Sequence, residues 1–140
     1  MHSFSFGGKE QERLEITVIS REGDASDDYA WLTVEVSIFA GHFQGKFPAA
    51  FVTQELAALY DQGMILYETL KGTAEFKTLE RQLGFVMKSN NLGHIELRGE
   101  ARDEAGTGNK LNFILTFDQT QLRTSLAELA SVLAACEVRT

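Results

Sequence analysis

Residues 41–47 read Gly-His-Phe-Gln-Gly-Lys-Phe, and two glycines followed by a lysine are the residue types of a phosphate-binding loop. That loop has four residues between its glycines, whose backbone N–H groups surround the phosphate, and a Ser or Thr after the lysine. Here three residues separate Gly41 from Gly45, and Phe47 follows the lysine. The segment therefore predicts a strand with a bulge or tight turn, and no nucleotide site.

Side chains that could bind a metal or act as nucleophiles are few and dispersed. His42 and His94 each stand at the start of a predicted strand, and neither has a second ligand at helical i+3 or i+4 spacing. Cys136 lies in an apolar helical stripe, which favours a role as a small core residue. The sequence has no Gly-x-Ser-x-Gly elbow to present a serine. We therefore expect no catalytic residue, no metal and no cofactor, and predict that the chain is not an enzyme.

Acidic residues are concentrated near the start of the chain. The first fifty residues hold eight acidic and four basic side chains, and the acidic residues Glu22, Asp24, Asp27 and Asp28 fall in one predicted loop. Their spacing lacks the regular ladder of oxygen ligands, ending in a distant Glu, that binds calcium. Two interpretations remain open. The loop is either an ordinary solvated segment or a docking patch for a basic protein.

Composition narrows the class of protein further. A chain of 140 residues with 44% apolar residues predicts one soluble domain covering residues 1–140. A net charge of −7 argues against nucleic-acid binding through a broad basic surface, and a single cysteine excludes an internal disulfide. The N-terminus has no secretory signal pattern, and no apolar run reaches about 18 residues. We therefore expect a cytoplasmic protein with no membrane or nucleic-acid partner.

Hydropathy periodicity predicts an α+β fold. Alternation every second residue indicates strands, and apolar residues every three or four residues indicate helices. Thr53 is the expected N-cap of the first helix, Gly63 within it marks a close approach of a strand, and Asp118 with Gln121 forms a capping box on the second. The strands are expected over residues 14–20, 31–39, 41–47, 73–77, 83–88, 94–102 and 110–117, and the helices over 53–70 and 118–136. The order βββ-α-ββββ-α predicts one twisted antiparallel meander sheet with two helices packed on its apolar face.

Two carboxylates lie within the first strands. If residues 14–20 pair with residues 31–39, Glu15 and Glu35 share the open face of the sheet with Thr17 and Thr33. Trp31 stands at the end of that face. Interfaces use aromatic anchors and charge complementarity, so this face is a candidate protein-binding surface.

Over roughly residues 30 to 135, the chain resembles the WapI-like family of bacterial immunity proteins, a family also described as an uncharacterised domain. The Gly-His-Ile and Asp-Gln-Thr-x-Leu segments are the most distinctive parts of the resemblance. The resembling segments are Trp31-Leu32-Thr33-Val34-Glu35-Val36, Gly41-x-Phe43-x-Gly45, Leu66-Tyr67-x-x-Leu70-Lys71-Gly72-Thr73-Ala74, Glu80, Gly93-His94-Ile95-Glu96-Leu97 and Leu111-x-Phe113-x-Leu115-x-Phe117-Asp118-Gln119-Thr120-x-Leu122.

The resemblance implies an antidote that binds and blocks the toxic domain of a polymorphic toxin, often a nuclease. The resemblance indicates no active-site residues in this chain. Independently, a nuclease must approach phosphates and so tends to be basic, which suits an acidic binding partner. The expected partner is therefore a basic toxin domain, and the candidate contact residues are Glu22, Asp24, Asp27, Asp28, Trp31 and Glu35.

Two alternative functions remain open at this point. The chain could bind a small ligand, or act on one, in a pocket between a curved sheet and its helices, lined by Trp31, Tyr60 and Tyr67 with a buried carboxylate. It could instead be a homo-oligomer that associates through sheet edges. A tightly filled core would count against the first alternative.

Overall fold

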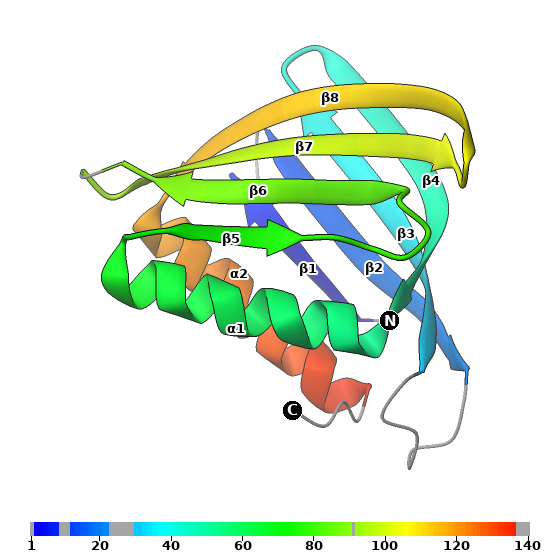
Figure 1. The fold of residues 1–140 in the computed structure, drawn as a ribbon, viewed down its shortest axis with the longest axis horizontal. Helices are drawn as coiled ribbons and strands as arrows, with labels where there is room; N and C mark the ends of the chain where they lie inside the picture. Colours follow the sequence, from blue (N-terminus) through cyan, green and yellow to red (C-terminus); the bar gives the residue numbers. More distant parts are fainter. Residues whose placement is uncertain (1, 9–11, 23–29, 91, 137–140) are drawn as a thin grey trace.

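The computed structural model describes residues 2–8, 12–22, 30–90 and 92–136, and Figure 1 shows the arrangement of its elements. Eight strands and two helices follow in the order ββββ-α-ββββ-α. They are β1 (His2–Gly7), β2 (Arg13–Glu22), β3 (Trp31–Ala40), β4 (Phe43–Val52), α1 (Thr53–Thr69), β5 (Thr73–Phe76), β6 (Leu83–Ser89), β7 (His94–Glu104), β8 (Thr107–Asp118) and α2 (Gln119–Ala135).

The strands form two four-stranded antiparallel sheets, ordered β1-β2-β3-β4 and β5-β6-β7-β8. The predicted α+β class and succession of elements are confirmed, with β1 as an additional strand at the start. The meander divides where α1 intervenes, so the strands make two sheets instead of the single sheet expected. A helix of 17 residues, and not a tight turn, links β4 to β5, and these two strands therefore do not pair.

One hydrophobic core lies between the sheets and the helices. Figure 1 shows the sheets crossing one in front of the other, with α1 and α2 below them. The ring of Phe6 from β1 lies 5.6 Å from that of Phe85 and 6.3 Å from that of Phe117, both in the other sheet. Phe51 and Phe76 make a second edge-on contact between the sheets at 5.2 Å. These aromatic contacts pack the two sheets against each other.

The start of α1 differs from the expectation. Val52 is the N-cap, and Thr53 is the first helical residue, so the predicted capping role of Thr53 is wrong. Thr53 is buried instead, where its N–H donates to the Ala30 carbonyl at 2.9 Å and its Oγ1 accepts from the Ala30 N–H at 3.2 Å. These two hydrogen bonds fix Ala30, the residue before β3, against the start of α1.

Gly63 does mark a close approach, but of a helix and not of the strand that was expected. A Cβ atom at Gly63 would lie 2.7 Å from Cδ2 of Leu126 in α2. Glycine therefore lets α1 and α2 pack closely against each other.

The carboxylate of Glu55 joins the first turn of α1 to the segment between β5 and β6. It accepts hydrogen bonds from the Val52 N–H at 2.7 Å and from the Leu79 N–H at 2.6 Å. Burial raises the pKa of this carboxyl above its ordinary value of 4.5, despite the two backbone donors, which act in the opposite direction.

A Glu55→Gln variant is expected to gain stability relative to the parent as pH rises. The folded-state pKa of Glu55 is raised, so the parent loses free energy of unfolding as pH climbs from 4.5 through that raised pKa, whereas glutamine does not titrate. Urea denaturation of both proteins on either side of this window measures the difference. A difference that stays constant with pH would show that burial does not govern this carboxyl.

Candidate partner-binding surface

The side chains that β2 and β3 turn away from the core form one continuous surface, which we call the β2–β3 outer face. It consists of Glu15, Thr17, Trp31, Thr33 and Glu35. Thr17 lies directly opposite Glu35 in the strand register. The alternating residues on the other side of β3 are buried, so the structure confirms that these side chains share one side of the sheet, and their role in binding stays a prediction.

Of the predicted contact residues, the structure brings Glu22 and Trp31 together. They are direct cross-strand neighbours at the ends of β2 and β3, and the indole is half-buried while Glu22 is exposed. Glu35 lies four residues along the same strand, on the same side of the sheet. The other three predicted contacts, Asp24, Asp27 and Asp28, lie outside the described residues.

Glu35 has one ion-pair partner among the described residues. Its Oε1 lies 3.4 Å from Nζ of Lys46 on β4, and the two side chains are 45% and 67% exposed, respectively. An exposed pair of this kind is worth about 0–1 kcal/mol. A cationic side chain of a partner could therefore replace Lys46 at little energetic cost.

Arg13 is a part of this surface that was not predicted from the sequence. The guanidinium carbon of Arg13 lies 4.7 Å from the centroid of the Phe39 ring, and the two residues are cross-strand neighbours. Alternation from Glu15 back by two residues places Arg13 on the same side of the sheet, and that was the available signal. The arrangement adds a flat aromatic and cationic border to the acidic carboxylates.

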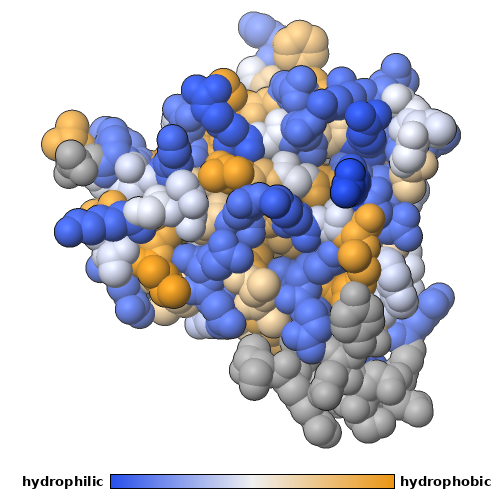
Figure 2. Space-filling view, in the orientation of Figure 1, coloured by the Kyte–Doolittle hydropathy of each residue, from blue (hydrophilic) through white to orange (hydrophobic). Residues whose placement is uncertain are grey.

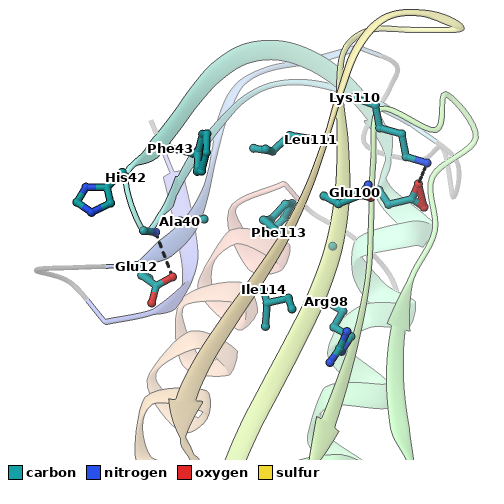
Figure 3. Close-up of a pocket in the computed structure, with 13 residues that line it drawn as sticks. Glu12, Ala40, His42, Phe43, Arg98, Glu100, Lys110, Leu111, Phe113 and Ile114 are labelled. Atoms are coloured by element: carbon teal, nitrogen blue, oxygen red, sulfur yellow. Dashed lines mark hydrogen bonds and ion pairs between the residues drawn. The ribbon is translucent and has the colours of Figure 1, made fainter.

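A surface trough of about 900 Å³ lies at the opposite end of the described sheets from the helices (Figure 3). We call it the β8 trough; the β3–β4 turn forms one wall, and the outer edge of β8 with the neighbouring part of β7 forms the other. Phe43, at 68% exposure, projects over it, and the side chains of Leu111 and Phe113 point toward it. Glu100 and Lys110 in its wall are ion-paired, and this pairing lowers the pKa of the Glu100 carboxyl.

The β8 trough differs from the pocket expected for a small ligand. That pocket required Trp31, Tyr60 and Tyr67 as its lining, and none of the three borders the trough. Tyr60 and Tyr67 pack against the core from α1 instead. The trough is therefore not the small-ligand pocket that was expected from the sequence.

Comparison with known proteins assigns the chain to a family. Residues 5–137 match the model of the immunity protein WapI-like family, which is nearly the whole chain. The chain belongs to the WapI-like family of immunity proteins. Curated proteins give no match. Membership in an immunity-protein family implies a toxin partner and suggests a non-enzymatic role.

The remaining reactive residues of this family member are separated. His42 lies in the β3–β4 turn, and His94 begins β7, where its Nδ1 lies 3.4 Å from Asn90 Nδ2. Cys136 is buried at the end of α2, and burial raises the pKa of its thiol. Within the described ranges, no group of three or more His, Cys, Asp or Glu side chains is placed to hold a metal ion. No helix in the same ranges is long and apolar enough to cross a membrane.

Proposed function

We propose that this chain binds the toxic domain of a bacterial polymorphic toxin in the cytoplasm and neutralises it by covering its working surface. The observation that carries the proposal is the β2–β3 outer face, where Trp31 has Glu22 as its cross-strand neighbour and Glu35 lies four residues further along β3 on the same side. A half-buried indole on a fixed backbone gives up little conformational entropy on binding, as interface anchors do. Family membership supplies the class of partner.

The proposed partner is basic, and a nuclease domain is the favoured class. A nuclease surface that holds phosphates attracts a chain of net charge −7, which speeds association and directs the inhibitor to the groove that its substrate would occupy. The outer surface of the other sheet serves as the comparison. This surface, turned toward the viewer in Figure 2, mixes both signs of charge in the pairs Lys77–Glu75, Arg98–Glu96 and Lys110–Glu100.

Substitutions on the β2–β3 outer face are expected to weaken toxin binding. Trp31→Ala should raise Kd by about 30-fold, since loss of an aromatic anchor costs about 2 kcal/mol. Glu35→Lys should mainly lower the association rate, and added salt should weaken binding by the parent. Surface plasmon resonance with a toxin domain captured by co-purification from the native operon measures all three.

Glu96→Lys provides the matched control because it makes the same charge change on the outer surface of the other sheet. Its affinity for the toxin domain should stay close to that of the parent. A triple charge reversal at Asp24, Asp27 and Asp28 tests the proposed acidic patch separately. Unchanged inhibition and association rate in the triple variant would remove that patch from the interface, and unchanged binding by Trp31→Ala would remove the β2–β3 outer face.

A further inference from the structure

Unpaired sheet edges invite association with other strands, and three of the four edges here are protected from it. At β1, Oε1 of Glu128 from α2 accepts the Ser5 N–H at 3.1 Å. At β5, Oε1 of Gln62 from α1 accepts the Glu75 N–H at 3.0 Å. At β4, Pro48 has no N–H to offer, and its carbonyl accepts from Nε2 of Gln82 at 3.1 Å.

The fourth edge, that of β8, carries no such protection over residues 110–116 among the described residues. β8 is 12 residues long, the longest strand, and pairs only with β7. Among the described residues its outer edge makes one hydrogen bond to another element, at its last residue, where the Asp118 N–H donates to Oε1 of Gln121 in α2 at 3.0 Å. None is found there for residues 110–116. Figure 1 shows it as the outermost strand of its sheet, with no helix beside it, whereas α1 runs below β5. Ile114, near its middle, is 47% exposed.

We propose that the β8 edge pairs antiparallel with the β8 edge of a second copy of this chain, about a twofold axis at Ile114. A twofold axis at this residue places Ile114 opposite its own copy. It also places Asn112 opposite Thr116 and Lys110 opposite Asp118. The two four-stranded sheets β5–β8 would then join into one continuous sheet.

This register is favoured because every outward-facing pair in it is complementary. The isoleucines make an apolar pair and the Asn–Thr pairs are polar. Each lysine meets Asp118 and would exchange its exposed pairing with Glu100 for that carboxylate, which also caps α2. An axis at Asn112 would instead place Lys110 opposite Ile114. An axis at Phe113 would place Asn112 opposite Ile114 and leave the lysine facing a threonine. Because these residues alternate along one strand, the charge pair and the apolar pair arise together only when Ile114 lies on the axis.

The β8 trough supplies space for the incoming strand. Its lining includes residues 110–114 of β8 as well as residues 98–100 of β7, and the register places residues 114–118 of the second copy opposite residues 110–114. Its volume of about 900 Å³ is open to the surface, and Phe43 projects over it (Figure 3). The exposed Phe43 ring would therefore gain a contact with the second copy.

Disulfide cross-linking tests the pairing and its register. In a Cys136→Ala background, Ile114→Cys alone should form a covalent dimer under mild oxidation, because each cysteine faces its own copy. Asn112→Cys alone and Thr116→Cys alone should not, but a mixture of these two variants should. If Ile114→Cys cross-links no faster than either of the other single variants, the proposed register is wrong.

Sedimentation of the purified parent chain across a wide concentration range tests the association itself. The parent should dimerise, and Ile114→Lys should raise the dimer Kd roughly tenfold or more, since it places two like charges opposite each other. Ile65→Lys, on an exposed isoleucine of α1, is the matched control and should leave the Kd unchanged. A monomeric parent at every concentration would overturn the proposal. If such a monomer loses toxin binding on Ile114→Lys, the β8 edge binds a toxin strand and not a second copy.

Discussion

Replacement of Phe6 by alanine is expected to lower the free energy of unfolding by about 4 kcal/mol, the range found for large cavities in packed cores. Phe6 is fully buried, and its ring contacts Phe4 in its own strand and Phe85 and Phe117 in the other sheet. Truncation would therefore remove contacts on both sides of the core at once. Because β1 lies against α2, the strand cannot shift easily to fill the space.

Phe43→Ala is the matched control because it makes the same chemical change at a ring that is 68% exposed. Its effect on the free energy of unfolding should stay within about 0.5 kcal/mol, as for most surface substitutions. Urea denaturation of the two variants, with the slope of the transition compared to the parent, measures both effects. Equal losses of stability would mean that Phe6 does not join the two sheets.

The strand that carries Phe6 is the element that sequence reasoning missed. Its pattern is short, with Ser3 and Ser5 alternating with Phe4 and Phe6 before a pair of glycines. Four alternating residues give a weak signal. The strand pairs with β2, where Phe4 lies opposite Ile16, and is fixed on its other side by Glu128 in α2, which lies far along the chain. A strand stabilised by distant contacts cannot be distinguished by pattern alone from an irregular terminus.

Local sequence patterns were sufficient to predict those features whose stabilising contacts are also local. The capping box of α2 is confirmed, with the Gln121 N–H donating to Asp118 at 2.8 Å and the Asp118 N–H donating to Gln121 at 3.0 Å. The alternation along β7 is confirmed from Ile95 to Ala101. The outer face shared by Thr17 and Glu35 follows from the same period of two.

Three features depend on contacts that the sequence does not encode locally. The division into two sheets depends on where α1 carries the chain, and the packing partner of Gly63 depends on where α2 lies. The third is the β7–β8 connection. The expected loop over residues 103–109 is shorter, since Glu104 already pairs with Thr107 across a register shift. A glycine-rich segment can hold strand structure when its neighbour supplies the pairing.

Protection of the sheet edges is likewise a product of the fold. Glu128 and Gln62 are ordinary polar positions on helices in the sequence, and only the folded chain places their side chains against strand edges. The β2–β3 outer face could be foreseen because it follows from strand alternation. The exposed edge of β8 could not be foreseen. It differs from the other three edges in lacking protection over residues 110–116, and that protection depends on the fold.

Gly99→Val is expected to lower the free energy of unfolding by about 3 kcal/mol, the upper part of the range for overpacking a core. Gly99 in β7 lies opposite Phe113 in β8, and a Cβ atom at Gly99 would lie 2.4 Å from the Cζ atom of that ring. The ring thus covers the glycine in place of a side chain, an arrangement that stabilises glycines in sheets. Since Phe113 is only 5% exposed, its ring would have to leave the core.

A double-mutant cycle separates this steric cost from the ordinary effect of valine in a strand. Phe113→Leu should be less damaging in the Gly99→Val background than in the parent, because the smaller side chain frees the space that valine needs. Gly45→Val is the matched control, since a Cβ atom at this glycine of β4 meets nothing within 4 Å, and its effect should be small. Additive losses in the cycle would contradict a direct contact between residues 99 and 113.

The Gly99→Val variant also bears on the β8 edge, because Gly99 and Phe113 both line the β8 trough. A displaced ring would occupy the space that a second copy needs, so Gly99→Val should reduce dimerisation even under conditions where the variant remains folded.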